Sequence, residues 1–323
     1  MKDFAGKLAV ITGGGSGMGR ELALQLVSEG CDVAMCDMIE NNLQETAGLC
    51  KEQAPQGVVV STHLCNVSEE SQVVRFRDEV QQQHQRDHIN LLFNNAGIGG
   101  GSSFIKDSRE DWERTFAVCW FGVYYNTRAF MPMLVASEEG HLINTSSVNG
   151  FWASLGPDTS QTAYGAAKFA VKGFSEALIN DLRLNAPHVK VSVVMPGHIG
   201  TSMGFNTPQV HGLADPTNLS PADVDDTRRR IAERGIDVTN LSDDEVRALV
   251  LQGAENFRDL APTTATAAAT VILDGVRAEK WRILIGEDAA ILDDLVRQDP
   301  ENAYTQEFMD TFTSQSPWLL GGN

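Results

Sequence analysis

The feature that most constrains the fold is a glycine-rich turn between a short apolar run and a helix-like segment. The run Lys7–Thr12 reads K-L-A-V-I-T, which is typical of a strand buried on both faces of a sheet. It leads into G-G-G-S-G-M-G at Gly13–Gly19, followed by R-E-L-A-L-Q-L-V. Glycines let the backbone approach a pyrophosphate, and a helix N-terminus presents free N–H groups to that anion. The pattern favours a dinucleotide site, with a simple tight turn as the alternative.

A carboxylate at the end of the next apolar run bears on the choice of cofactor. Asp37 ends the run D-V-A-M-C-D, eighteen residues after Gly19. An acid at this place accepts hydrogen bonds from ribose hydroxyls and repels a 2′-phosphate. Met38 follows it and offers that phosphate no basic partner. The sequence therefore favours NAD over NADP.

Three further residues indicate acid–base chemistry. Tyr164 and Lys168 are written Y-G-A-A-K, and Ser147 precedes them in N-T-S-S-V at the end of a strand-like run. Residues i and i+4 share a helix face, so the Lys168 ammonium can lie beside the Tyr164 phenol and favour its ionised form. A phenol with a reference pKa of about 10 then becomes a usable acid or base near neutral pH. Alone, such a pair is more often a packed ring and a solvated amine, and the glycine turn favours the catalytic interpretation.

Two more motifs occur in the expected order, N-N-A-G at Asn94–Gly97 and P-G-H-I-G-T at Pro196–Thr201. With these five motifs the chain resembles the short-chain dehydrogenase/reductase family, over about residues 4–203 and again over about 262–286. The resemblance implies that Ser147 polarises the substrate oxygen, that Tyr164 moves the proton, and that Lys168 lowers the pKa of Tyr164 while binding the nicotinamide ribose. The cofactor-binding residues that it implies are Gly13, Ser16, Gly17, Met18, Gly19, Asp37, Met38, Asn66, Val67, Asn95, Ala96, Gly97, Tyr164, Lys168, Ile199 and Thr201.

The sequence departs from the family pattern at two positions. Asn66 stands where the family usually has Asp, but an amide can still hydrogen-bond adenine. The motif VNxxG appears as V-C-W-F-G, which puts Cys119 where an Asn usually supports the water chain from the lysine to solvent. A thiol is a weak donor and a weak acceptor. Either backbone and water alone support catalysis around a small buried residue, or proton relay is impaired and turnover is slow.

Strand and helix signals alternate along the whole chain, which predicts one α/β domain over residues 1–323. We expect a doubly wound Rossmann-type fold, with a seven-stranded parallel sheet, helices on both faces and a helical lid. The predicted strands start near Lys7, Asp32, Val58, Ile89, His141, Val189 and Arg282. Ligands of such sheets bind at the C-terminal ends of the strands, where the motifs described above fall.

Composition bounds the partners and the location. The formal net charge of −18 argues against nucleic acid or an anionic membrane as a partner. Neither a signal-peptide pattern nor an apolar run of about twenty residues is present. The five cysteines form no CxxC pair, which suits free thiols in a reducing compartment. We expect a cytoplasmic protein.

The histidines give no strong signal for a metal. His84 and His88 have HxxxH spacing, but they lie in a polar stretch and lack the Glu of HExxH. A solvated helix end is the favoured interpretation, and no metal site is predicted. His198, which follows the P-G turn, either reaches the active site or, as we favour, is a plain loop histidine.

Two segments extend beyond a compact family member. In residues 203–260, S-P-A-D from Ser220 and S-D-D-E from Ser242 predict helices over about 220–234 and 241–260. This inserted segment is interpreted as a lid over the substrate, with surface decoration as the alternative. A C-terminal extension over about 287–323 has helical periodicity from Ala289. Its aromatic residues pack either on this subunit, which we favour, or on a neighbouring subunit. These residues are Tyr304, Phe308, Phe312 and Trp318. The extra apolar surface fits an oligomer, and a homodimer or homotetramer is expected.

The substrate is outlined by apolar residues that follow Ser147 and begin the inserted segment, namely Phe151, Trp152, Leu155, Met203 and Phe205. They predict an apolar, aromatic pocket with few charges, suited to a hydrophobic secondary alcohol or ketone of cyclic, aryl or steroid-like shape. Fold resemblance does not choose among these. Two other functions stay open: a non-redox enzyme that uses bound NAD, and a cofactor-binding protein of low activity because Cys119 replaces the usual Asn.

Overall fold

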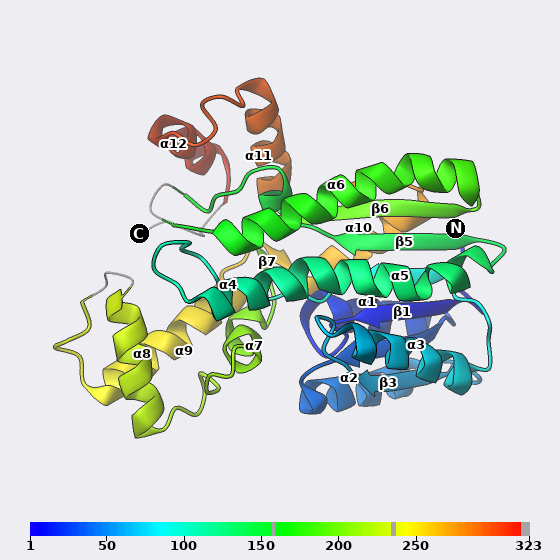
Figure 1. Ribbon diagram of the computed structural model, residues 1–323, viewed down its shortest axis with the longest axis horizontal. Coiled ribbons are helices and arrows are strands. Elements are labelled where there is room, and N and C mark those ends of the chain that lie inside the picture. Colours follow the sequence, from blue (N-terminus) through cyan, green and yellow to red (C-terminus); the bar gives the residue numbers. More distant parts are fainter. Residues whose placement is uncertain (157–158, 234–236, 318–323) are drawn as a thin grey trace.

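The computed structural model describes residues 1–156, 159–233 and 237–317, and its centre is a seven-stranded sheet in the order β3-β2-β1-β4-β5-β6-β9 (Figure 1). All neighbouring strands run parallel. The strands are β1 (Leu8–Thr12), β2 (Asp32–Asp37), β3 (Val60–Leu64), β4 (Leu91–Asn94), β5 (Gly140–Thr145), β6 (Val189–Pro196) and β9 (Arg282–Ile285). Each begins within two residues of its predicted start, so the predicted sheet is confirmed.

Helices cover both faces of the sheet because the central strands are apolar on both faces. In β1, Ala9 and Ile11 belong to the core on one face, and Leu8 and Val10 to the core on the other. The first face is covered by α1 (Gly17–Ser28), α2 (Glu40–Gln53) and α10 (Ala265–Arg277). The second face is covered by α3 (Glu70–His84), α5 (Gly122–Val135) and α6 (Thr162–Asn185). This doubly wound arrangement confirms the predicted fold class.

The strand order reverses between β1 and β4, which places a crevice at their C-terminal ends. Gly13 follows β1 and Asn95 follows β4 at this point. Ser147 follows β5, and Gly197 follows β6. The topology therefore brings four motifs that are far apart in the sequence to one edge of the sheet.

The inserted segment forms helices α7 (Met203–Val210), α8 (Pro221–Glu233) and α9 (Asp243–Asp259). Figure 1 shows them, in yellow-green and yellow, gathered beyond one end of the sheet. The two predicted helices, α8 and α9, are confirmed, whereas α7 was not predicted. Ser242 begins α9 through a capping box, since its Oγ accepts from the Glu245 backbone N–H and Glu245 accepts from the Ser242 N–H at 2.7 Å. A short parallel pair, β7 (Ile199–Gly200) and β8 (Thr263–Thr264), joins the base of the segment.

The C-terminal extension forms α11 (Glu287–Gln298) and α12 (Gln306–Gln315), drawn in orange and red in Figure 1. Phe308 and Phe312 are buried with Trp152 in a separate small core. The Trp152 indole N–H donates to the Ala303 carbonyl at 2.6 Å. Packing on the same subunit is therefore confirmed for these two rings, while Tyr304 is 58% exposed. Trp318 lies outside the described residues.

The expectation of a solvated helix end is wrong for His84, which is buried at the end of α3, while the His88 side chain is 37% exposed. His84 Nε2 lies 2.8 Å from Ser61 Oγ, and His88 Nδ1 lies 3.0 Å from a carboxylate oxygen of Asp87. All five cysteines are free and buried. In the described parts of the chain, none of the helices has the length and apolarity needed to cross a bilayer.

Candidate active site

The glycine turn after β1 adopts a backbone shape that side chains disfavour. Gly13 has φ 68° and Gly17 has φ 53°, both in the left-handed region. A Cβ on Gly19 would overlap the carbonyl of Gly13, so glycine is needed for α1 to start this close to the turn. The first N–H groups of α1 have no intrahelical partner. The turn therefore offers the free donors and close approach that a pyrophosphate requires.

Asp37 lies beside this turn at the end of β2. Its Oδ2 accepts from the Gly15 N–H at 2.9 Å, and its Oδ1 accepts from the Met38 N–H at 2.7 Å. Burial raises the pKa of Asp37, although these backbone hydrogen bonds and the charge of Arg20 oppose the rise. Arg20 was not singled out by the sequence, and its guanidinium is already held by the Gly15 carbonyl at 2.9 Å and by Glu45 at 2.6 Å.

A cavity of about 120 Å³ runs from Asp37 across the glycine turn toward β4. The predicted cofactor residues that line it are Gly13, Ser16, Gly17, Met18, Asp37, Met38, Val67, Asn95, Ala96, Gly97 and Thr201. Residues that the sequence did not indicate also line it: Ile39, Cys65, Ile98, Val118, Asn206, Thr207 and Val210. Three of these come from α7, which no cofactor motif marks.

Two predicted cofactor residues have other surroundings. Gly19 lines neither this cavity nor the larger one described below, and it acts through the close packing of α1. Asn66 lines neither cavity, and its Oδ1 accepts from the N–H and Oγ of Ser68 at 3.0 and 2.7 Å. In contrast, the buried Oδ1 of Asn95 has no partner among the described residues. That free acceptor and the glycine cradle fit a dinucleotide.

Ser147, Tyr164 and Lys168 come together beside this cavity. Ser147 precedes the single 3₁₀ turn η2 (Val148–Gly150), and its Oγ accepts from the Asn149 N–H at 3.1 Å. The other two lie in the first turns of α6, and Lys168 Nζ is 5.3 Å from the centre of the Tyr164 ring. Lys168 is 2% exposed and donates to the Thr145 carbonyl at 2.8 Å.

The electrostatics of this group differ from the expectation that Lys168 lowers the pKa of Tyr164. Burial and the nearby Cys119 raise the pKa of Tyr164, and only a hydrogen bond with Ser147 acts to lower it. Burial also lowers the pKa of Lys168. Desolvation thus dominates the local electrostatics, and Tyr164 holds its proton more firmly than a free phenol.

Cys119 lies in a π-helical turn, η1 (Ala117–Phe121), between α4 (Arg109–Phe116) and α5. It is fully buried, and its thiol donates to the Ile98 carbonyl at 3.3 Å. Gly97 lies close to both Cys119 and Lys168, since a Cβ there would be 3.8 Å from Sγ and 3.5 Å from Nζ. The thiol therefore contacts the loop after β4 and occupies a packed position near the lysine.

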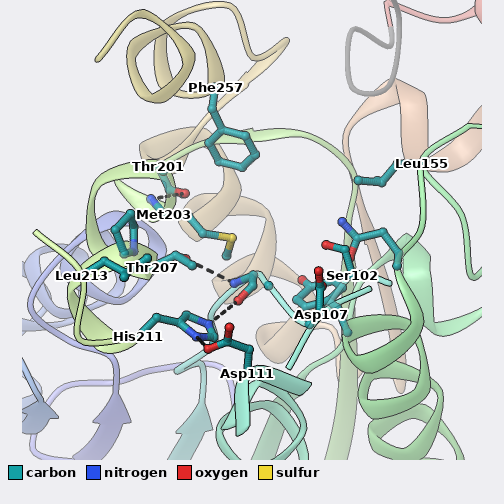
Figure 2. Close-up of a pocket in the computed structure, with 18 of the residues that line it drawn as sticks. Ser102, Asp107, Asp111, Leu155, Thr201, Met203, Thr207, His211, Leu213 and Phe257 are labelled. Carbon is teal, nitrogen blue, oxygen red and sulfur yellow. Dashed lines mark hydrogen bonds and ion pairs between the residues drawn. The ribbon is translucent and has the colours of Figure 1, made fainter. Parts of the chain in front are cut away.

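A second cavity, of about 980 Å³, has Ser147 and Tyr164 in its lining. Figure 2 shows part of this lining from close by. The inserted segment supplies much of its lining, including Met203, His211 and Phe257. Figure 2 shows Phe257, Met203 and Leu155 on one side of the cavity, with His211 and Asp111 on the other. The segment is therefore a wall of the cavity, as the lid interpretation requires.

The lining corrects the expectation of an aromatic pocket with few charges. Leu155 and Met203 line the cavity as expected. Phe151 and Trp152 instead face the core of the C-terminal extension, and the Phe205 ring lies 5.1 Å from the guanidinium of Arg258. Besides Lys168, the charged residues in the lining are Lys106, Asp107, Asp111, Asp223, Asp226, Arg229 and Arg230. The position of Trp152 shortly after Ser147 in the sequence was a poor guide to the lining of the cavity, because α11 and α12 pack against Trp152 instead.

His198 lies at the edge of the same cavity but is held by the protein on two sides. Its N–H donates to the buried Asp288 carboxylate at 2.7 Å, and Nε2 lies 2.8 Å from the Phe257 carbonyl. Burial lowers the pKa of His198. These contacts join the start of α11 and the end of α9 to the loop after β6.

The chain resembles known proteins over nearly its full length. The SadH protein of Mycobacterium tuberculosis, which carries an oxidoreductase name, is 34% identical over 298 residues, 92% of each chain. Epidermal retinol dehydrogenase 2 of Homo sapiens is 32% identical over 203 residues, which cover 62% of this chain and 63% of that protein.

The solved structures that are similar to this chain include one with NAD and one with NADP. A short-chain dehydrogenase/reductase of Burkholderia phymatum in complex with NAD has a TM-score of 0.73 and 29% identity, with coverage of 93% of this chain and 96% of that one. A metagenomic short-chain oxidoreductase in complex with NADP has a TM-score of 0.53 and 30% identity, over 60% of this chain and 83% of that one. The family model described as short chain dehydrogenase matches residues 7–210. The chain belongs to the short-chain dehydrogenase/reductase family of oxidoreductases.

Proposed function

We propose that this protein is an NAD-dependent oxidoreductase that interconverts a hydrophobic secondary alcohol and its ketone. The observation that carries the proposal is that Ser147, Tyr164 and Lys168 together line the larger cavity, which fits a substrate. This cavity meets the smaller, dinucleotide-fitting one at shared lining residues such as Asn95, Gly97 and Thr201. The nicotinamide, when bound, supplies the acceptor or donor of hydride. The retinol dehydrogenase name of one relative supports chemistry at a CH–OH group.

The proposed roles of the three residues follow from their positions. Ser147 hydrogen-bonds the substrate oxygen and holds it next to the Tyr164 hydroxyl. Tyr164 gives its proton to the ketone oxygen in reduction and removes it from the alcohol in oxidation. Its raised pKa favours the protonated form. Lys168 Nζ has three N–H donors, of which one is used by the Thr145 carbonyl. The other two are available to bind the nicotinamide ribose.

NAD is the proposed cofactor, although similar structures hold either NAD or NADP. Asp37 is the supporting residue, because its carboxylate stands where a ribose hydroxyl would donate and where a 2′-phosphate would meet a like charge. Arg20 is the nearby base that could offset this repulsion. Its ion pair with Glu45 and its bond to the Gly15 carbonyl occupy it.

The proposed substrate is larger than a simple alcohol. A cavity of about 980 Å³ is at the upper end of the range for small-molecule sites. Leu155, Met203 and Phe257 suit an apolar skeleton, and the charged residues of the lining suit polar groups of the same substrate. A polycyclic or long-chain alcohol matches this division better than a short one.

We also propose that the protein is a single-domain, cytoplasmic protein and that it forms a homodimer or homotetramer. An aromatic face supports the proposed oligomer. Trp112, Phe116, Phe121 and Tyr125 contact one another in series along α4, η1 and α5, with stacked rings at both ends of the series and an edge-to-face contact between Phe116 and Phe121. Phe121 at the end of η1 is 38% exposed and Tyr124 of α5 is 39% exposed, so the face presents apolar rings to its surroundings. Analytical ultracentrifugation of the protein and of Tyr124→Glu tests this proposal, and a monomeric parent protein would contradict it.

The deciding experiment is a screen of cyclic, aryl, steroid and long-chain secondary alcohols with NAD, followed at the absorbance of NADH. Turnover that disappears in Tyr164→Phe supports the proposal. Tight NAD binding without net NADH formation, but with conversion of a substrate, would favour a non-redox enzyme that uses bound NAD. Binding without any conversion would favour a cofactor-binding protein, for which the buried Cys119 is the specific observation.

A further inference from the structure

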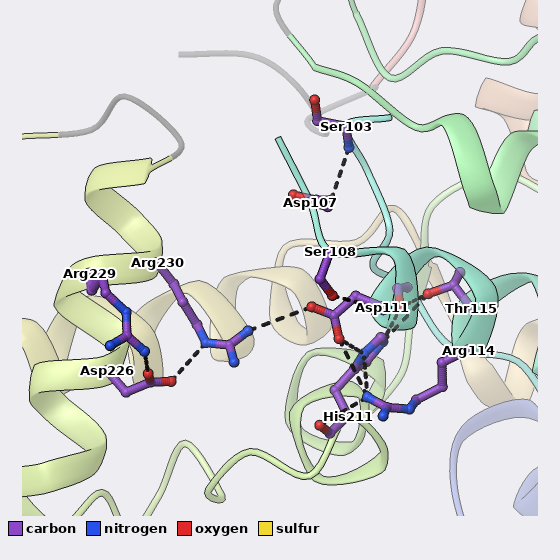
Figure 3. A network of polar contacts seen from close by, with 11 residues as sticks. Ser103, Asp107, Ser108, Asp111, Arg114, Thr115, His211, Asp226, Arg229 and Arg230 are labelled. Atoms are coloured by element: carbon purple, nitrogen blue, oxygen red, sulfur yellow. Dashed lines mark hydrogen bonds and ion pairs between the residues drawn. The ribbon is translucent and has the colours of Figure 1, made fainter. Parts of the chain in front are cut away.

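One carboxylate of α4 contacts two separate parts of the inserted segment (Figure 3). Asp111 Oδ1 lies 3.1 Å from Nδ1 of His211, which directly follows α7. Asp111 Oδ2 lies 3.8 Å from Nη1 of Arg230 on α8. All three side chains line the substrate cavity. Asp111 is thus a single point at which two stretches of the wall meet the body of the protein.

The His211 ring has an acceptor at each nitrogen. Its side chain is 6% exposed, and Nε2 lies 3.1 Å from the Gly99 carbonyl while Nδ1 faces Asp111. Thr115 Oγ1 lies 3.5 Å from Nε2 and does not donate to it, because its single proton goes to the Gly99 carbonyl at 3.2 Å, and Arg114 Nη1 lies 3.5 Å from Nδ1. Both ring contacts form together only when each nitrogen carries a proton. The contact between His211 and Asp111 is largely buried, since their side chains are 6% and 26% exposed.

The other charges around this pair are compatible with an ionised Asp111. Partial burial acts to raise the pKa of Asp111, but hydrogen bonds from His211 and Ser108 and the charges of His211 and Arg230 outweigh it, so the pKa is lowered. Arg114 is the second cation facing His211, and its Nη1 donates to the His211 backbone carbonyl at 3.2 Å. Arg230 is 41% exposed and also pairs with Asp226, so its contact to Asp111 is the weaker of the two.

The same residues join the wall to the loop that follows the cofactor motif after β4. The Gly99 N–H donates to Thr207 Oγ1 of α7 at 3.2 Å. Gly100 has φ 104°, and a Cβ there would lie 2.7 Å from His211 Nε2. This loop, α4 and the inserted segment therefore fit together only with His211 in its present place.

We propose that Asp111 is a positioning residue that keeps the inserted segment closed over the substrate cavity, acting through His211 and Arg230. This proposal rests on the proposed function, since the inserted segment closes the cavity that is assigned to the alcohol. Asp111 does not touch the reacting atoms. Its loss opens the wall and weakens the hold on substrate, while Ser147, Tyr164 and Lys168 stay in place.

The first test needs no turnover. Hydrogen exchange of backbone amides is compared between the parent protein, Asp111→Asn and the control Glu113→Gln. Glu113 lies on the same helix and loses the same charge, but it pairs with exposed Arg109 at 2.7 Å and does not line the cavity. Asp111→Asn is expected to speed exchange over residues 211–231 about ten-fold. Equal exchange in Asp111→Asn and the control overturns the proposal.

The second test asks whether closure serves the substrate. With the best alcohol from the screen, Asp111→Asn is expected to raise KM about ten-fold and to change kcat less than about three-fold, because a binding contact is lost and the reacting groups are not. Faster exchange with an unchanged KM would overturn the link to substrate. If no alcohol is converted, the proposed function fails, and the exchange experiment still tests the contact itself.

A double-mutant cycle shows whether the contacts act through Asp111 and guards against simple misfolding. His211→Gln and the surface variant Arg230→Gln are made in the parent and in Asp111→Asn, with thermal melting of each. Each is expected to speed exchange in the parent, His211→Gln more than Arg230→Gln, and to add little in Asp111→Asn. Full additivity of both would show that Asp111 is not their common partner and would overturn the proposal.

Discussion

The cofactor groove and the substrate cavity share a border, yet they depend on the sequence in different ways. The groove is formed by turns that directly follow strands, so a motif at Gly13–Gly19 or Asn94–Gly97 also fixes a place in space. The cavity is formed by segments that meet only in the folded chain, such as Asp111 of α4 and His211 after α7. Local backbone requirements leave a readable pattern, whereas contacts between distant side chains do not.

The largest expected effect tests the residues at the border of the two regions. Tyr164→Phe should lower turnover about a thousand-fold or more, because it removes the proton donor and keeps the ring. NAD affinity should change little. Steady-state rates and a binding titration measure both, and Tyr304→Phe, which removes a 58% exposed phenol in the C-terminal extension, serves as control. A Phe variant with similar turnover would mean that another group moves the proton.

The next prediction concerns the C-terminal extension, which packs against Val148 and Trp152 in the segment that follows Ser147. Phe312 is fully buried against Trp152, and Phe312→Ala should lower the free energy of unfolding by about 3–5 kcal/mol. Tyr304→Ala, at a 58% exposed position, should cost about 1 kcal/mol or less. Denaturant unfolding measures both. Equal small losses would show that the extension is not part of the stable core.

A smaller effect is expected for Asp37, which lines the cofactor groove. Asp37→Ala should narrow the preference for NAD over NADP about ten-fold, because it removes a like charge beside the 2′-phosphate. Titrations of both cofactors measure it, and Asp78→Ala, an exposed acid on α3, is the control. Equal affinity of the parent protein for the two cofactors would remove the basis of the NAD proposal.

The smallest expected effect is at Cys119, where the sequence breaks its own pattern. The thiol is fully buried and bonded to Ile98, so the bulkier amide of Cys119→Asn should lower stability by about 1 kcal/mol or more and reduce activity. Cys119→Ser keeps the size and the donor and should stay nearer to the parent. Turnover against pH and thermal melting test this. A several-fold gain in the Asn variant at unchanged stability would show that the natural relay is handicapped.

The contrast between the two regions also explains which sequence-based predictions held. The sheet, the start of α9 at Ser242 and the turn at Gly13 were predictable because periodicity, capping and positive φ act within a few residues. The surroundings of Trp152 were not, since it is buried by α11 and α12 and its indole N–H donates to Ala303, 151 residues away. The pKa of Tyr164 was also misjudged, because helical spacing predicts a neighbouring lysine but not the burial and the nearby Cys119, which raise this pKa.

The sequence by itself determined the family, the doubly wound sheet and the residues of the glycine turn, because each depends on short-range backbone geometry and on apolar patterning. Tertiary structure alone decided that α7 lines the cofactor groove, that the cavity wall is charged, and that Asp111 meets His211 and Arg230. The physical reason is separation along the chain. Asp111 and His211 are 100 residues apart, and no local pattern records a hydrogen bond whose two partners are brought together by the packing of the whole domain.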